Sequence, residues 1–149
     1  MITQTFVNLP VKDLDRAINF FTELGFEFNA KFTDENATCM IVNENTFVML
    51  LKEEFFKKFI EKKKISDSVK STEVIIALQL NSRDEVDEMM DDVLDAGGTD
   101  VRREDMDWMY SRTFSDLDNH LWEFVYMDES GMPENEEDEE DWGDEEEEE

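Results

Sequence analysis

The chain has 149 residues, 40% of them hydrophobic, which is enough for one domain with a buried core. Its net charge of −27 is concentrated in residues 128–149, which hold 15 acidic side chains and no Lys or Arg. Such an acidic chain repels phosphate backbones and anionic lipid, which argues against nucleic acid and membrane surfaces as partners. The single cysteine, Cys39, leaves no internal disulfide and favours a cytoplasmic location.

The pattern of apolar residues predicts the same order of elements twice: a strand, a helix and three strands. In the first half these are predicted at residues 5–11, 13–24, 26–32, 37–43 and 46–52. In the second half they are predicted at residues 72–80, 82–98, 99–104, 109–115 and 120–127. Asp13 and Ser82 are the predicted N-caps of the two helices, and Glu85 completes a capping box. The chain therefore contains an internal βαβββ repeat.

Residues 52–71 connect the two halves and hold seven of the 14 basic residues of the chain. The first part is predicted to be helical, with Phe55, Phe56, Phe59 and Ile60 as an apolar face. We favour a solvated connector. The alternatives are a lid over a pocket and a docking site for the acidic end of the chain.

These elements predict one domain followed by an acidic tail. The predicted boundaries are residues 1–128 for the domain, 3–51 and 72–128 for its two modules, and 129–149 for the tail. The tail has few apolar residues and charges of one sign, so it is predicted to be disordered.

Two stretches of the chain resemble the vicinal oxygen chelate superfamily, which includes glyoxalases, bleomycin-resistance proteins and extradiol dioxygenases. Residues 7–28 (VNLPVKDLDRAINFFTELGFEF) resemble its opening strand, turn and helix, and residues 115–124 (SDLDNHLWEF) resemble its closing turn and strand. The resemblance covers about residues 3–128. It implies an α+β glyoxalase/bleomycin-resistance fold in which two βαβββ modules pair their sheets into a cup. It also implies a small-molecule ligand and a homodimer.

Metal-using members of this superfamily place ligands on the first and last strands of each module. The resemblance carries these positions onto Phe6, Met49 (or Val48), Ile75 and Glu123. Only Glu123 has a side chain that binds hard or borderline divalent ions well. We therefore expect no metal, and the sequence implies no other cofactor. Whether the protein is an enzyme stays open.

His120 and Glu123 are three residues apart on a predicted strand, so their side chains point to opposite faces. We expect His120 to have a structural role in the turn, where Asn119 replaces the family's glycine and tolerates a left-handed conformation. Glu123 is the candidate catalytic residue, because a carboxylate on the face lining the cup suits proton transfer or binding of a polar ligand group. The alternative is a structural Glu123 paired with Arg112 or Tyr110.

Strand alternation extends the candidate site to a mainly apolar set with a few polar groups, which is typical of small-molecule sites. The candidate ligand-binding residues are Phe6, Asn8, Phe47, Met49, Ile75, Gln79, Trp108, Tyr110 and Arg112. Tyr110 and Arg112 belong to this set if their face of strand 109–115 points inward, which is the arrangement we favour. Trp108 would stack on a flat ligand or pack in the domain.

Three functions are consistent with these features. The favoured one is a metal-free protein that binds a small, partly apolar molecule. The second is a lyase, isomerase or dioxygenase of the superfamily that uses Glu123, with a metal. The third is a non-catalytic interaction protein whose cup is filled by its own side chains.

Overall fold

The computed structural model describes residues 1–133. The predicted tail begins at residue 129, and its part from residue 134 onward lies outside the described residues. The described part of the tail, residues 129–133, contains a short 3-10 helix, η3 (Glu129–Gly131). None of the helices in residues 1–133 is both long enough and apolar enough to cross a bilayer.

Both halves of the chain have the predicted α+β architecture, so the fold class is confirmed. The first module contains β1 (Thr5–Val11), α1 (Leu14–Glu23), β2 (Glu27–Phe28), η1 (Ala30–Phe32), β3 (Ala37–Asn43) and β4 (Thr46–Lys52). The second module contains β5 (Ile75–Gln79), α3 (Arg83–Asp95), β6 (Thr99–Met106), β7 (Met109–Ser115) and β8 (Leu121–Met127). Between them lie α2 (Glu53–Phe56), η2 (Lys57–Phe59) and an irregular segment, residues 60–74.

The two longer helices begin at the predicted residues. The carboxylate of Asp13 accepts a hydrogen bond from the backbone N–H of Arg16 at 3.1 Å, and the hydroxyl of Ser82 accepts one from Glu85 at 3.1 Å. Both bonds satisfy N–H groups that have no partner within the first turn. The Glu85 side chain reaches one residue further back than a capping box requires and accepts from the N–H of Asn81.

One predicted strand is mostly wrong. Residues 26–32 were expected to be extended, but only Glu27–Phe28 pairs, and residues 30–32 form η1. The side chain of Asn29 accepts a hydrogen bond from the N–H of Lys31 at 3.0 Å and so caps this short helix. The apolar residues of the stretch indicated a strand, but the cap at Asn29 ends it after two residues.

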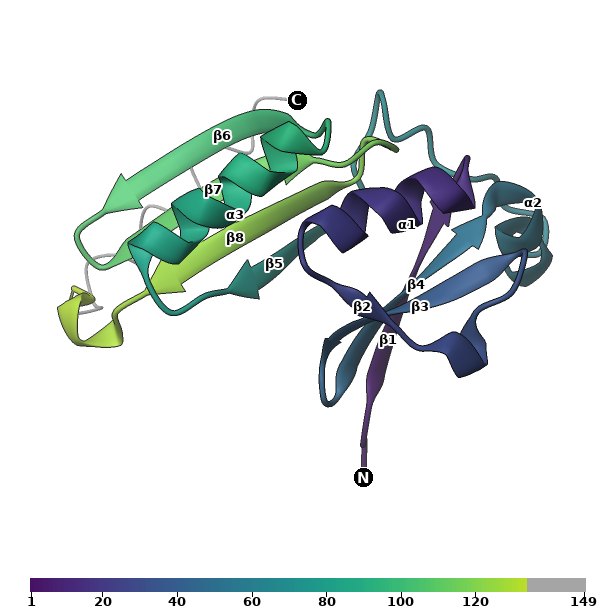
Figure 1. The fold of residues 1–149 in the computed structure, drawn as a ribbon, viewed down its shortest axis with the longest axis horizontal. Coiled ribbons are helices and arrows are strands. Elements are labelled where there is room, and N and C mark those ends of the chain that lie inside the picture. The colour runs from purple at the N-terminus through teal and green to yellow at the C-terminus, as the bar shows by residue number, and fades with distance from the viewer. Residues whose placement is uncertain (134–149) are drawn as a thin grey trace.

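Each module forms a four-stranded mixed sheet, with α1 packed on one face of the first sheet and α3 packed on one face of the second (Figure 1). The first sheet has the order β1-β4-β3-β2 and the second has the order β5-β8-β7-β6. In both sheets the first and last strands of the module pair in parallel, and the other pairs are antiparallel. This places β1 and β5 at sheet edges.

The two modules share one hydrophobic core. Phe20 and Phe21 of α1 contact the second sheet, where the Phe21 ring lies 5.0 Å from that of Trp122 and the Phe20 ring lies 6.4 Å from that of Phe114. All four side chains are almost completely buried. Burial of such large aromatic surfaces is a main source of folding free energy, so α1 fixes the second module to the first.

Alternation along the strands gives each sheet a core side and an outer side, which we call the outer face. Leu9 and Val48 point to the core in the first sheet, and Trp122 and Phe124 do so in the second. The intervening residues lie on the outer faces, where Phe6 and Ile75 are 47% and 52% exposed. The outer faces of the two sheets therefore point away from the shared core.

Candidate functional site

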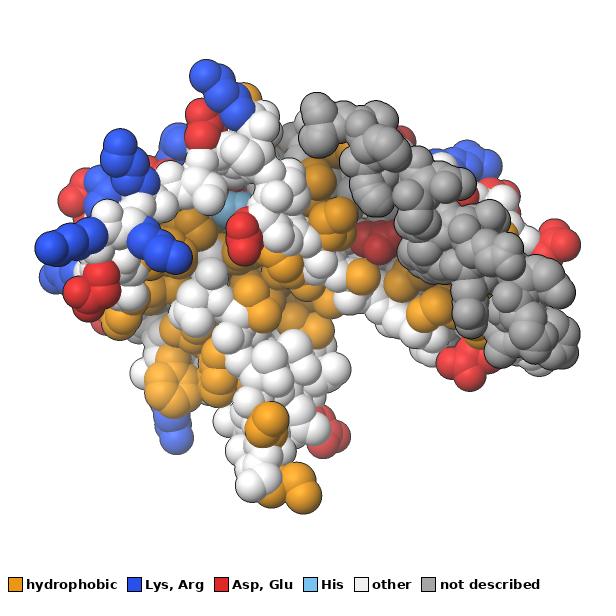
Figure 2. Space-filling model, turned by 180° about the vertical axis from the view of Figure 1, so that it is seen from behind, with side chains coloured by type: hydrophobic (Ala, Val, Ile, Leu, Met, Phe, Trp, Pro, Cys, Tyr) orange, Lys and Arg blue, Asp and Glu red, His pale blue; other side chains and the backbone are white. Residues whose placement is uncertain are grey.

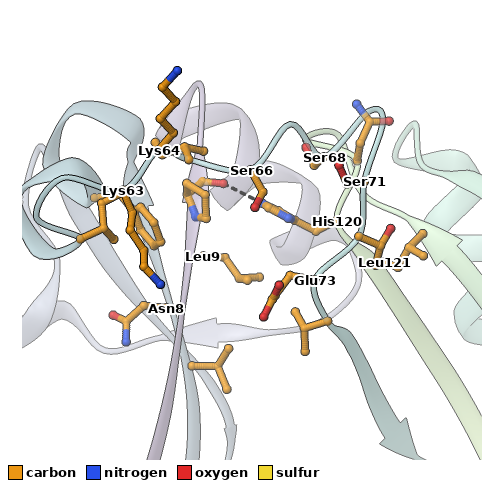
Figure 3. A pocket seen from close by; sticks show the side chains of 18 residues that line it. Asn8, Leu9, Lys63, Lys64, Ser66, Ser68, Ser71, Glu73, His120 and Leu121 are labelled. Atoms are coloured by element: carbon orange, nitrogen blue, oxygen red, sulfur yellow. Dashed lines mark hydrogen bonds between the residues drawn. The ribbon is translucent and has the colours of Figure 1, made fainter.

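A pocket of about 420 Å³ lies where the two modules meet, between β1 and the start of β8. The irregular segment 60–74 runs along one side of this pocket (Figure 3). Its apolar walls come from all three parts of the chain: Val7, Leu9, Pro10, Phe56, Ile60, Ile65, Val74 and Leu121. The volume is within the range of pockets that bind small molecules.

Polar side chains are placed around these apolar walls. They come mainly from the connector and from the turn before β8: Asn8, Lys63, Lys64, Ser66, Ser68, Ser71, Thr72, Glu73, Asn119 and His120. The Lys63 side chain points toward Asn8, Glu73 approaches from the opposite side, and the Lys64 amine points away from the pocket (Figure 3). The pocket thus combines apolar surface with a few groups able to orient a ligand.

The turn at residues 116–120 forms one wall of the pocket around a buried carboxylate. Asp116 is 6% exposed and accepts hydrogen bonds from the N–H groups of Asp118 and His120 and from the indole N–H of Trp122, at 2.8, 3.0 and 2.9 Å. Burial raises the pKa of Asp116, and His120 together with these N–H donors offsets part of that rise. As expected, Asn119 adopts the left-handed conformation, with φ at 68°.

The same turn joins the second module to the first. The His120 ring donates from Nε2 to the carbonyl of Pro10 at 2.6 Å, and the Asp118 carboxylate accepts from the backbone N–H of Lys12 at 2.9 Å. Arg16 lies 3.5 Å from the Asp118 carboxylate. The Ser68 hydroxyl donates to the Asp118 carbonyl at 2.7 Å, so the connector is held by this turn as well. His120 therefore has the expected structural role and also lines the pocket.

Most of the residues predicted to line the cup lie on the outer faces of the two sheets. Within a single chain, those on the first sheet are not close to those on the second. Strand register places Asn8 beside Met49 and Phe6 beside Phe47 on the first sheet. On the second sheet it places Ala77 beside Glu123 and Ile75 beside Leu121, with Gln79 on the same face. Of the nine predicted ligand-binding residues, only Asn8 lines the pocket.

Tyr110 and Arg112 lie on the core side of β7, so the expectation that they share the face of Glu123 is wrong. Their register partners are Tyr126 and Phe124, whereas Glu123 pairs with Thr113. The Tyr110 hydroxyl donates to Asp87 of α3 at 2.6 Å, and Arg112 contacts Asp87 at 3.0 Å and Asp100 at 2.8 Å.

The Tyr110 hydroxyl lowers the pKa of Asp87, burial opposes this, and Arg112 adds to the lowering. Burial and the bond to Asp87 raise the pKa of Tyr110. A structural pairing of Glu123 with either Tyr110 or Arg112 is excluded, since both side chains are engaged on the other side of the sheet.

Trp108 is remote from the pocket. It lies in the turn between β6 and β7, where its carbonyl accepts a hydrogen bond from the N–H of Asp128 at 2.8 Å. A side chain at Gly131 would lie 3.3 Å from the Trp108 Cβ, so this residue packs beside the segment that follows β8. Stacking of Trp108 on a ligand in the pocket is excluded by this position.

The residues at the four metal-ligand positions do not fit a divalent ion. Phe6 and Ile75 have no donor atom, and Met49 offers only a thioether, which is a poor ligand for Mn²⁺, Mg²⁺ or Zn²⁺. Nowhere in residues 1–133 do three His, Cys, Asp or Glu side chains come together in a metal-binding arrangement. Glu123 alone would leave such an ion mostly to water, so no step through a metal follows from these residues.

Sequence reasoning missed most of the pocket. Lys63, Ser66 and Glu73 belong to an irregular segment, for which strand alternation gives no orientation. The available signal was the concentration of lysines in the connector, together with the alternative interpretation of that segment as a lid. The lining by connector residues agrees with that alternative.

Comparison with known families and solved structures supports the fold described above. Residues 3–43 match the family model described as bleomycin resistance protein-like N-terminal. No curated protein matches the chain. A hypothetical protein from S. aureus is 28% identical, with a TM-score of 0.72 over 85% of this chain and 94% of that one. The chain thus has the glyoxalase/bleomycin-resistance fold of the vicinal oxygen chelate superfamily, and its N-terminal part matches a bleomycin-resistance family model.

More distant superfamily structures share only the fold with this chain. A glyoxalase/bleomycin resistance protein/dioxygenase family enzyme from Burkholderia phytofirmans is 12% identical, with a TM-score of 0.68 over 82% of this chain and 96% of that one. A fosfomycin resistance protein from Listeria monocytogenes, determined in complex with Mn(II) and sulfate, is 19% identical. Its TM-score is 0.60 over 85% of this chain and 90% of that one.

Proposed function

We propose that this protein is a member of the vicinal oxygen chelate superfamily and binds a small, partly apolar molecule in the pocket between its modules. The observation that carries the proposal is the apolar pocket of about 420 Å³, with polar side chains at its edges. A second hollow of about 560 Å³, which shares residues 63–66 and 68 of the connector with this pocket, is lined mainly by charged side chains. It offers an apolar molecule much less surface to contact.

A thermal-shift screen of small apolar and amphipathic compounds tests this proposal. Val74 lines the pocket and is 42% exposed, so Val74→Trp should fill the space with little effect on folding. We expect ligands that raise the melting temperature of the wild type and lose this effect in Val74→Trp. Loss of the effect in Glu123→Gln but not in Val74→Trp would place the ligand on the outer face of the second sheet. If no compound stabilises the wild type, the proposal loses its support.

The binding is proposed to need no resident metal, because three of the four ligand positions are Phe6, Met49 and Ile75. Metal analysis of the protein, purified without chelators, should find well below one Zn, Mn, Fe or Ni per chain. A stoichiometric, tightly held metal would instead favour the alternative of a metal-assisted enzyme. In that case Glu123→Gln should reduce the metal content, whereas the neighbouring change Thr113→Ala should not.

A second copy of the chain is the proposed partner. Among the described strands, β1 and β5 each pair on one side only, and each exposes an apolar residue, Phe6 or Ile75. Unpaired strand edges of this kind favour pairing with another chain. A two-fold dimer with β1 of one copy beside β5 of the other would cover both edges and would border the pocket. It would also bring the outer face of the first sheet beside the outer face of the partner's second sheet.

Light scattering coupled to size exclusion tests the dimer. The molar mass of the wild type measured across its elution peak is expected to be twice the chain mass of 17.6 kDa. Ile75→Lys places a charge on the proposed contact and should favour the monomer, whereas the exposed Lys70→Ala should not. A wild type that remains monomeric at high protein concentration would contradict the dimer without affecting the pocket.

A further inference from the structure

The polar groups of the pocket indicate the class of ligand, an inference that rests on the proposed small-molecule binding. We propose that the pocket takes an amphipathic monoanion, with its apolar body between the modules and its anionic group held by Lys63 and Asn8. The shared chemistry is a single oxyanion, such as a carboxylate or a sulfonate, attached to an apolar group.

Lys63 is placed to bind such an anion. Its side chain points toward Asn8 and the pocket, and within residues 1–133 it forms no ion pair (Figure 3). An ammonium group and the amide N–H groups of Asn8 are both donors, which suits an oxyanion. The adjacent Lys64 has its amine directed away from the pocket, so the two lysines differ in orientation but not in charge.

The charge around this side of the pocket contrasts with the rest of the chain. Residues 52–71 carry seven lysines and four carboxylates, a net charge of +3 in a chain of −27. Lys and Arg side chains gather at the end of the molecule that carries α2, beside hydrophobic side chains (Figure 2). Carboxylates elsewhere on the surface act on an anion only weakly, because physiological salt screens charges over about 8 Å.

Glu73 limits the ligand to one negative charge and sets its orientation. This carboxylate lines the pocket on the side opposite Lys63 (Figure 3). A second anionic group near Glu73 would be repelled, since like charges at short range oppose binding. The anion is therefore held on the β1 side, next to Asn8.

The apolar walls require that the rest of the ligand be hydrophobic. Val7 and Leu9 line the pocket from β1 and Leu121 lines it from β8, and Phe56 and Ile60 complete the apolar surface from the connector. Burial of apolar area is favourable in proportion to the area removed from water, so the body of the ligand supplies affinity and Lys63 supplies discrimination.

Isothermal titration with three compounds of equal chain length tests the inference: octanoate, octanol and octylamine. We expect the wild type to bind octanoate about fivefold more tightly than octanol, the size expected for a partly solvated ion pair, and octylamine most weakly. Lys63→Gln should abolish the preference for octanoate, whereas the matched change Lys62→Gln, at an exposed connector lysine outside the pocket lining, should retain it. Glu73→Gln should strengthen octanoate binding by a few fold.

The outcomes separate this inference from the broader proposal. If all three compounds bind the wild type equally and Val74→Trp weakens all of them, the pocket binds apolar molecules but the anion preference is wrong. If Val74→Trp leaves octanoate binding unchanged, the pocket is not the site and both proposals fail. If octanoate does not bind the wild type, or if Lys62→Gln acts like Lys63→Gln, the inference about Lys63 is overturned.

Discussion

The two walls of the pocket are built in different ways. The turn at 116–120 is centred on Asp116, which accepts three hydrogen bonds while only 6% exposed. The connector segment 60–74 is mostly exposed, and its backbone hydrogen bonds join residues close in sequence, such as Lys63 to Ile60 and Ser71 to Asp67. One wall is therefore fixed by buried polar contacts, whereas the other carries the charged groups and depends on few contacts with the rest of the domain.

The largest expected difference between the two walls is in the loss of stability when one aspartate is removed from each wall. Asp116→Ala leaves three N–H donors without their acceptor in a buried site, and should lower the free energy of unfolding by about 3 kcal/mol. Asp67 accepts a hydrogen bond from the N–H of Val69 within the exposed connector, so Asp67→Ala should lower the free energy of unfolding by only about 0.5 kcal/mol. Urea unfolding measures both. Equal effects would mean that the walls do not differ in stability.

Ser68 gives a smaller and more local effect, because its hydroxyl bond to the Asp118 carbonyl ties the connector to the turn. Ser68→Ala should lower the free energy of local opening by about 1 kcal/mol. Cleavage by trypsin at the exposed lysines 62–64 requires the connector backbone to open into the protease site, so Ser68→Ala should be cleaved there about fivefold faster than the wild type. Ser66→Ala, in the same segment, is the control. Unchanged cleavage in Ser68→Ala would show that other contacts hold the connector.

The same contrast explains which features could be predicted from the sequence. The strands and helices follow from apolar alternation and from caps such as Asp13 and Ser82, which are local properties of the chain. The outer-face positions of Phe6, Asn8 and Glu123 follow from alternation once one residue of each strand is placed. The left-handed Asn119 follows from its place in the turn.

Other features depended on tertiary contacts. On β7, both faces have residues that suit a core or a pocket, and only the register with Phe124 decides that Arg112 points to α3. The pocket could not be predicted because Lys63 and Glu73 lie in a segment without regular periodicity. The predicted residues of the two outer faces do not line one pocket within a single chain, because Phe20 and Phe21 of α1 pack against the second sheet and the outer faces point away from the shared core.

The smallest expected effects on the free energy of unfolding come from relieving backbone strain. Two non-glycine residues among those described have positive φ, one in each wall. Asn119 has φ at 68° and Glu61 has φ at 59°. Asn tolerates this conformation and glutamate does so less well, while glycine adopts it freely. Glu61→Gly should therefore raise the free energy of unfolding by about 0.5 kcal/mol, because relief of strain exceeds the greater entropy of an unfolded glycine.

Asn119→Gly should change the free energy of unfolding by less than about 0.5 kcal/mol, whereas Asn119→Ala should lower it by about 1 kcal/mol. Thermal unfolding of the three variants measures these differences. A destabilised Glu61→Gly would mean that the glutamate side chain makes contacts that outweigh its backbone strain. The connector would then be held more firmly than its exposure indicates, and Lys63 would be positioned by a wall as well ordered as the turn opposite.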